Sequence, residues 1–301
     1  MEEKIKIIID TDIGDDIDDA FALEYAIKDE HFDILGVTTV YKNCLQRAEM
    51  SKKILHLHGL DNIGVYCGYD KPMKEDIKKF LCEHYNEQGM VDLLSYREDL
   101  KEYKVEEKHA VDFILEAVKN NPHQVILYGL GPMTNIAYAI LKEPETMKLV
   151  KEIIVMNGNR DGVLEYNIMV DPEATKIVYD SGLPVRLVGG NVTMKCIFNQ
   201  RWLHRCLAIK TPAMNYINEM MMEWISYNMR PPIMHDALTI SVLLHNYVTF
   251  KPLLAEVQLE TNRGHIKPTE LDEMKEGAHL ASLSVDNIGF LEHFFEMMEK
   301  Q

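Results

Sequence analysis

The sequence predicts an α/β fold with a single domain over residues 1–301, in which helices flank one mostly parallel central sheet. Two observations predict it. Apolar, strand-like stretches alternate with helix-like stretches along the chain, which is typical of parallel strands joined by crossover helices. The chain also has no internal repeat, low-complexity segment or Pro/Gly/Ser-rich linker that would separate two domains. We therefore expect one open, Rossmann-like sheet.

Each expected element has a local signal. Residues 4–10 (KIKIIID) form an apolar run that predicts a buried strand, and residues 18–28 (DDAFALEYAIK) predict a helix with acids in its first turn. Residues 32–40 (FDILGVTTV) predict the next strand, and 45–59 a helix that Gly59 closes. Further strand–helix pairs are expected at 124–129 with 131–145, at 152–158 with 170–182, and at 184–190 with a Met-rich helical stretch over 200–228.

The composition limits the partners that the protein can have. The formal net charge is −16, which argues against a nucleic acid or an anionic membrane, and 47% hydrophobic residues are typical of a globular protein. Five cysteines without a CxxC pair indicate reduced thiols rather than a disulfide framework or a zinc site. The N-terminus lacks the apolar run of a signal peptide and no stretch reaches membrane-spanning length, so we expect a cytoplasmic protein.

Six aspartates lie within ten residues at the first strand–helix junction: Asp10, Asp12, Asp15, Asp16, Asp18 and Asp19. So many like charges repel one another unless something offsets them. Acids in front of a helix can cap it, but two would be enough for capping. A hard divalent cation explains six acids better, because carboxylates suit Ca²⁺ or Mg²⁺ and this loop contains no Cys or His.

Two known carboxylate loops differ from this one. An EF-hand does not fit, because Gly14 is the fifth residue counted from Asp10 and Phe21 stands where the bidentate Glu belongs. A haloacid-dehalogenase-type phosphatase also begins with a strand and DxD, so DTD alone does not exclude it. That family continues as DxDGT, however, and here Ile13 and Gly14 follow.

The acidic loop is one of three polar segments that follow predicted strands. They are residues 10–19, 129–135 and 157–167. In open α/β folds, ligands bind beyond the C-terminal ends of the strands. We therefore expect the three segments to converge on one crevice.

Motifs along the chain resemble those of the nucleoside hydrolases, the inosine–uridine-preferring N-ribohydrolases. DTDxG followed by DDA stands at the first strand–helix junction, and VTTVYKN (37–43), VYCGYDKPM (65–73), GPMTNIA (131–137), EYNIMVDPEA (165–174), MHDAL (234–238) and VDNIGFL (285–291) follow in order. The resemblance spans nearly the whole chain. It implies the α/β fold of that family and hydrolysis of the N-glycosidic bond of ribonucleosides to free nucleobase and ribose.

The resemblance also implies a Ca²⁺ ion at the base of the site. Its implied ligands are Asp12, Asp19, the main-chain carbonyl of Leu130 and Asp236, with the ribose 2′- and 3′-hydroxyls and one water completing the shell. The chain has two more residues between Gly14 and the DDA pair than the shorter family form. We align the pair with Asp18 and Asp19 because AFAL follows it; Asp15 and Asp16 are the alternative.

Two residues match the catalytic groups of the family. Cleavage of an N-glycosidic bond passes through an oxocarbenium-like sugar, which a site rich in carboxylates stabilises. Asp12 matches the general base that acts on a calcium-bound water, and His235 matches the proton donor to the leaving base. Taken alone, His235 is more simply a solvated or core histidine, so its assignment depends on the MHDAL motif.

The sugar needs directional donors and acceptors. Asp18 can accept from a ribose hydroxyl, and four residues match the ribose contacts of the family: Asn43, Asn159, Glu165 and Asn167. The side chains of Glu165 and Asn167 point the same way if their segment is extended. We expect Asp10 to accept backbone N–H bonds within its loop, without contact to the metal.

Two classes of function remain open. One is a calcium-dependent hydrolase of ribonucleosides or of a related ribosyl compound, and the other is a nucleoside- or metal-binding protein without turnover. The resemblance and the base rate for enzymes predict a homo-oligomer, either a dimer or a tetramer. Residues 70–90 and 200–232 are candidate lids. Residues 214–227 have two interpretations, a wall of the base pocket or, more simply, helical core.

Overall fold

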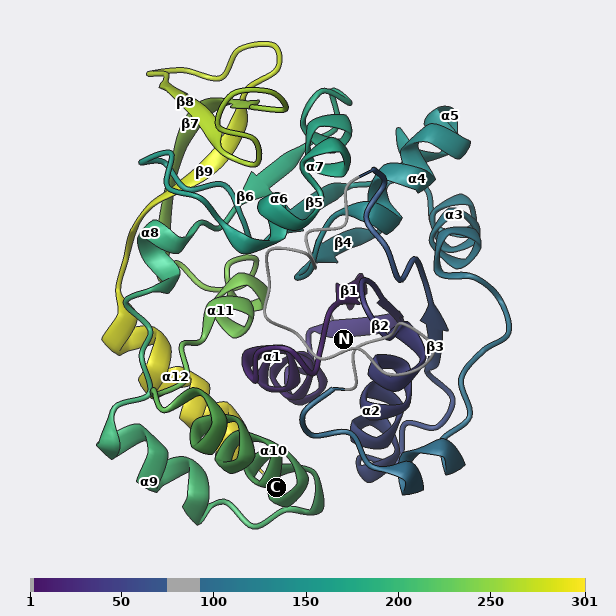
Figure 1. Cartoon of the computed structure of the whole chain (residues 1–301), viewed down its shortest axis with the longest axis vertical. Coiled ribbons are helices and arrows are strands. Elements are labelled where there is room, and N and C mark those ends of the chain that lie inside the picture. Colours follow the sequence, from purple (N-terminus) through teal and green to yellow (C-terminus); the bar gives the residue numbers. More distant parts are fainter. Residues whose placement is uncertain (1–2, 75–92, 301) are drawn as a thin grey trace.

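The computed structural model describes residues 3–74 and 93–300. Its centre is a nine-stranded sheet in the order β3-β2-β1-β4-β5-β6-β9-β7-β8 (Figure 1). The strands are β1 (Ile5–Thr11), β2 (Phe32–Thr39), β3 (Gly64–Cys67), β4 (Ile126–Gly129), β5 (Glu152–Val155), β6 (Val185–Leu187), β7 (Val248–Val257), β8 (Ile266–Glu270) and β9 (His279–Val285). Neighbours from β3 to β9 pair in parallel, and β7 pairs antiparallel with both β9 and β8.

Helices cover both faces of the sheet. They are α1 (Asp18–Lys28), α2 (Cys44–Leu57), α3 (Ala110–Asn120), α4 (Thr134–Lys142), α5 (Pro144–Met147), α6 (Tyr166–Val170), α7 (Pro172–Tyr179), α8 (Gly190–Thr193), α9 (Gln200–Ala208), α10 (Pro212–Asn228), α11 (His235–Ser241) and α12 (Asn287–Glu299), with a 3-10 turn, η2, at Glu98–Glu102. The predicted α/β fold with a mostly parallel, helix-flanked sheet is thus confirmed. Among the described residues, no helix is both long and apolar enough to cross a bilayer.

The strand β1 shows why the sheet is buried on both sides. Ile7 and Ile9 belong to one hydrophobic cluster, together with Phe21 of α1 and Phe294 of α12. Ile8 points the other way and packs in a second cluster, which includes side chains of α3, α4 and α7. A parallel strand covered by helices on each face typically has a continuous run of apolar residues, as β1 does.

The parallel order brings the C-terminal ends of β1, β4, β5 and β6 to one edge of the sheet. Leu130 continues the pairing beyond β4, since its N–H donates to the Asp10 carbonyl over 2.8 Å. The helix α11 reaches the same edge from far along the chain and packs against α1 (Figure 1). This edge is where the three polar segments were expected to converge.

Candidate functional site

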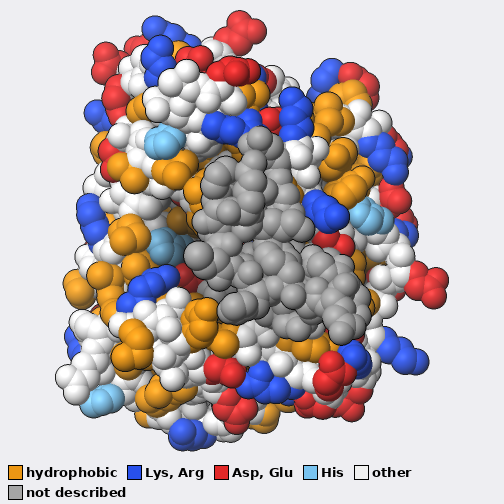
Figure 2. All heavy atoms as spheres, in the orientation of Figure 1, with side chains coloured by type: hydrophobic (Ala, Val, Ile, Leu, Met, Phe, Trp, Pro, Cys, Tyr) orange, Lys and Arg blue, Asp and Glu red, His pale blue; other side chains and the backbone are white. Residues whose placement is uncertain are grey.

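A cavity of about 1000 Å³ lies at this edge of the sheet. The three polar segments contribute Asp12, Leu130 and Asn159, among others, and α11 contributes His235 and Asp236. The expected convergence on one crevice is confirmed. In the same orientation as Figure 1, Figure 2 shows that hydrophobic side chains and side chains of both charges are exposed on this face of the molecule.

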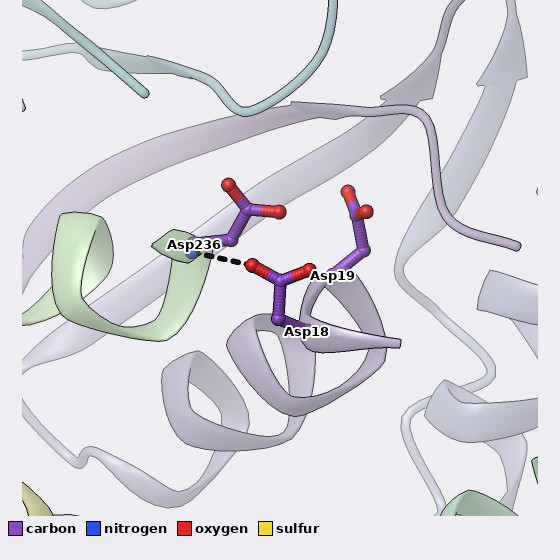
Figure 3. A group of neighbouring side chains, drawn as sticks. All are labelled: Asp18, Asp19 and Asp236. Carbon is purple, nitrogen blue, oxygen red and sulfur yellow. Dashed lines mark hydrogen bonds between the residues drawn. The ribbon is translucent and has the colours of Figure 1, made fainter. Parts of the chain in front are cut away.

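Three carboxylates meet inside the cavity (Figure 3). Asp18 and Asp19 begin α1, Asp236 lies in the first turn of α11, and each offers an oxygen that lies within 4.8 Å of the other two. The Asp236 N–H donates to Asp18 Oδ2 over 2.9 Å, and the Thr11 hydroxyl donates to Asp19 Oδ1. All three acids are buried, so this edge of the sheet concentrates negative charge away from water.

Burial and mutual repulsion both disfavour the ionised forms of these acids. Burial, followed by the charge of Asp18, raises the pKa of Asp19 to about 8. Burial raises the pKa of Asp236 well above its usual range, and the charges of Asp18 and Asp19 add to this effect. A donor set made only of buried carboxylate oxygens fits a hard dication, which would offset the repulsion.

Asp12 and Leu130 lie beside these acids and line the same cavity. A Cβ at Gly131 would lie 2.9 Å from Asp12 Oδ1, so the missing side chain at Gly131 lets the carboxylate sit against the main chain. Burial, followed by the charge of Asp19, raises the pKa of Asp12 well above its usual range. The Leu130 carbonyl accepts from Asn167 Nδ2 over 2.7 Å.

The structure separates Asp15 and Asp16 from the group of three. Asp15 Oδ2 is 2.7 Å from Lys42 Nζ and 3.2 Å from Arg47 Nη2. Burial alone would raise the pKa of Asp15, but Arg47 and Lys42 together lower it. Asp16 pairs with Arg230 over 3.2 Å. Both acids therefore have basic partners, whereas Asp18 and Asp19 face Asp236.

The aspartates do not cap α1, because its N-cap residue is Ile17 and no side chain caps that end. The expectation for Asp10 is wrong in its partners. Asp10 Oδ1 accepts from the Thr38 hydroxyl over 2.5 Å and from Asn135 Nδ2 over 2.8 Å, so side chains rather than backbone N–H groups hold it. It lies within the sheet, where the neighbouring strand and α4 supply the donors. Burial raises the pKa of Asp10 to about 7.

Three of the four matched ribose contacts line the cavity: Asn159, Glu165 and Asn167. Asn43 is not among the lining residues; it is the N-cap of α2 and accepts from the Gln46 N–H over 3.3 Å. The segment at Glu165 and Asn167 is not an extended strand, so the condition for their side chains to point the same way is not met. Glu165 caps α6 and accepts from the N–H groups of Asn167 and Ile168. Burial raises the pKa of Glu165 to about 7.

His235 is half-buried and lines the cavity next to Asp236. Its Nδ1 lies 2.6 Å from the Thr193 hydroxyl, which fixes the orientation of the ring. Burial, followed by the charge of Arg230, lowers the pKa of His235 to about 4. The imidazole is therefore neutral at pH 7 in the ion-free chain.

The cavity has an apolar wall that the sequence motifs do not mark. It contains Leu93, Leu94, Met194, Trp224 and Tyr227, with Arg230 beside them. The guanidinium of Arg230 lies 4.6 Å from the centre of the Trp224 ring. Leu93 and Leu94 follow a charge-rich stretch with no motif, so no local signal could have identified them.

Only one of the two candidate lid segments can be located in the structure. Most of residues 70–90 lies outside the described residues. In 200–232, the end of α10 reaches the cavity through Trp224, Tyr227 and Asn228. Earlier in α10, Met214, Met220 and Met221 are buried in the core. Both interpretations of residues 214–227 therefore hold, each for a different part of the helix.

The raised carboxyl pKa values predict an unusual pH dependence of stability. Asp10, Asp19 and Glu165 have folded-state pKa values of about 7, 8 and 7 against ordinary values of 3.8, 3.8 and 4.5. At these three groups the folded chain therefore binds more protons than the unfolded chain between about pH 4 and pH 8, and their contribution to stability falls as the pH rises. The lowered pKa of His235 acts in the opposite direction, but only below about pH 6.5. The slope is about 1.4 kcal/mol per pH unit for each group within its window.

Thermal unfolding in a chelator checks this expectation. We expect the Tm of the ion-free chain to fall from pH 5 to pH 8, and added Ca²⁺ to raise the Tm more at pH 8 than at pH 5. A Tm that rises with pH in the chelator would contradict the assigned burial of these carboxyls.

Comparison with known proteins places this geometry in a family. The family model described as "Inosine-uridine preferring nucleoside hydrolase" matches residues 7–292. The inosine-uridine preferring nucleoside hydrolase of Crithidia fasciculata is 30% identical over 224 residues, which are 72% of this chain and 70% of that protein. A probable uridine nucleosidase 2 of Arabidopsis thaliana is 30% identical over 271 residues, with 85% and 83% covered.

Solved structures agree in fold over almost the full chain. A purine-preferring ribonucleoside hydrolase from Gardnerella vaginalis superposes with a TM-score of 0.82 at 26% identity, covering 98% of each chain. A plant nucleoside hydrolase has a TM-score of 0.81 at 23% identity, covering 99% of each chain. The chain belongs to the inosine-uridine preferring nucleoside hydrolase family.

Proposed function

We propose that this protein is a calcium-dependent hydrolase that cleaves the N-glycosidic bond of ribonucleosides to free nucleobase and ribose. One observation carries the proposal. Acids from two segments more than 200 residues apart, Asp18 and Asp19 with Asp236, meet in a cavity that also holds buried hydrogen-bonding groups for a sugar. Membership of the nucleoside hydrolase family supports it.

The residues that would hold the ion are Asp12, Asp19, the carbonyl of Leu130 and Asp236. Asp18 has one oxygen engaged by the Asp236 N–H, so we assign its other oxygen to a ribose hydroxyl. The ionic partners of Asp15 and Asp16 support the alignment of the DDA pair with Asp18 and Asp19. When bound, Ca²⁺ would offset the carboxylate charge and act as a Lewis acid towards oxygen ligands.

The chain's own residues then carry the proton transfers. Asp12 takes a proton from the attacking water, and the surrounding carboxylates favour the positive charge that develops on the sugar. Asn159, Glu165 and Asn167 orient the ribose. Asn167 uses Nδ2 for the carbonyls of Leu130 and Met156, which leaves Oδ1 as an acceptor. For Asn43, contact with the ribose would require its side chain to leave the cap of α2.

We assign His235 as the donor to the leaving base through the N–H of its neutral imidazole, since burial lowers its pKa to about 4. Replacing His235 with Asn is expected to lower kcat for a nucleoside by about 10²-fold or more, the usual contribution of a general acid. A riboside whose leaving group is p-nitrophenolate needs no proton, so its kcat should change much less. Initial rates with both substrates check this; equal losses on both would contradict the role.

A reducing-sugar assay with inosine and uridine, with and without a chelator, tests the proposed function. We expect ribose release that the chelator abolishes and Ca²⁺ restores. Calorimetric binding of a nucleoside without ribose release would instead favour the alternative, a binding protein without turnover. The presence of both Asp12 and His235 in the cavity argues against that alternative. Homo-oligomeric assembly and a cytoplasmic location stay predictions.

A further inference from the structure

Arg47 is a charged residue that is completely buried. It lies in the first turn of α2, which packs beside β2 and β3 (Figure 1), and its exposed fraction is 0%. Removing a guanidinium from water costs several kcal/mol unless partners replace the lost hydration. The hydrogen-bond partners of Arg47 must therefore offset this cost.

The guanidinium joins two backbone segments that are distant in sequence. Nη1 donates to the carbonyl of Asp12 and, over 2.7 Å, to the carbonyl of Ile13. Nε donates to the carbonyl of Tyr41 over 2.8 Å. The first segment carries the proposed general base, and the second leads from β2 into α2. One side chain thus holds the floor of the cavity to the neighbouring loop.

Both segments need such support. Tyr41 and Lys42 adopt left-handed backbone conformations, with φ of 66° and 57°, which are uncommon for residues other than glycine. In the acidic loop, Gly14 has φ of 105°. Asp15, which follows Gly14, has Oδ2 3.2 Å from Arg47 Nη2 and 2.7 Å from Lys42 Nζ.

We propose that Arg47 is a positioning residue for the metal site: by holding the carbonyls of Asp12 and Ile13, it fixes the direction in which the Asp12 carboxylate faces the ion. The inference rests on the proposed function. Asp15 supplies a charge beside the guanidinium that helps to retain it, and we assign Asp15 no contact with the ion.

The test measures Ca²⁺ affinity by calorimetry, at a temperature at which circular dichroism shows each variant folded. Arg47→Met keeps the length of the side chain and removes every donor, so we expect affinity to fall by about 10-fold to 100-fold, as for other residues that orient metal ligands. Arg186→Met is the matched control. Arg186 is half-buried, and like Arg47 it pairs with an acid, Glu152, and donates to a carbonyl, but it does not line the cavity.

Further variants keep the test decisive if Arg47→Met does not fold. Arg47→Lys keeps the charge with one nitrogen in place of three, and we expect at least about a fivefold loss of affinity. Asp15→Asn removes the charge beside the guanidinium but leaves its backbone hydrogen bonds, so we expect a loss of affinity smaller than that of Arg47→Met. Wild-type affinity in Arg47→Met or Arg47→Lys overturns the inference. Absence of Ca²⁺ binding to the wild type would instead sink the proposed function.

Discussion

Replacing Asp19 with asparagine is expected to reduce kcat/KM for a ribonucleoside by at least about 10³-fold, equal to about 4 kcal/mol of transition-state stabilisation. Asparagine is nearly isosteric, and its carbonyl oxygen can still accept from the Thr11 hydroxyl. The change therefore removes a charge that faces Asp18 and Asp236 without altering the packing. Initial rates measure the loss of kcat/KM, and calorimetric titration with Ca²⁺ measures the loss of metal affinity that we expect with it.

The same substitution should stabilise the ion-free chain. Burial and the charge of Asp18 both raise the pKa of Asp19, so the ionised carboxylate of Asp19 destabilises the folded, ion-free chain. Neutralising it removes that cost, and the Tm in a chelator at pH 8 should rise. Lost activity combined with gained stability is the expected pattern for an acid kept for function.

Asp286→Asn is the matched control. Asp286 caps α12 through the Gly289 N–H, is exposed and does not line the cavity, and asparagine caps helices about as well. We expect its kcat/KM to stay near the wild-type value. Turnover in Asp19→Asn that matches this control at saturating Ca²⁺ would refute the assignment of Asp19 to the ion.

The elements that could be predicted are those whose environment is uniform along their length. β1 and β2 are covered on both faces and read as apolar runs, and the predicted helix at 18–28 agrees with α1 at both ends. The strand β7 is different, because buried and exposed residues follow one another in it without strict alternation. The antiparallel part of the sheet, β7 with β8, therefore gave no clear signal in the sequence.

Some residues of the candidate site could likewise be predicted from the sequence, and others could not. The acids were found because they cluster in the chain and match a motif, and their meeting with Asp236, which the packing of α11 against α1 brings about, was implied only by the resemblance. Of the apolar wall, the sequence offered only residues 214–227, and only as one of two interpretations, because Trp224 and Tyr227 share a helix with core methionines. Asn43 matched a motif but caps a helix, since an asparagine at a helix start serves either role.

Uridine is expected to be hydrolysed at least about 10³-fold more efficiently than 2′-deoxyuridine, because a site built to bind a hydroxyl discriminates strongly against its absence. The two substrates share the same base, so only the sugar is tested. Buried Asp18 and Asn167 line the cavity, each with an acceptor that we assign to ribose. Without the 2′-hydroxyl, such groups stay desolvated and unpaired.

Intrinsic reactivity works against this preference. The 2′-hydroxyl withdraws electrons and destabilises an oxocarbenium-like sugar, so the deoxynucleoside is the more labile compound in water. Any preference for uridine must therefore come from contacts that the protein makes with the hydroxyl in the transition state. Steady-state kcat/KM values for both substrates measure it, and Asn167→Leu should narrow the ratio. Ratios within about tenfold in the wild type would show that these buried groups do not hold the sugar.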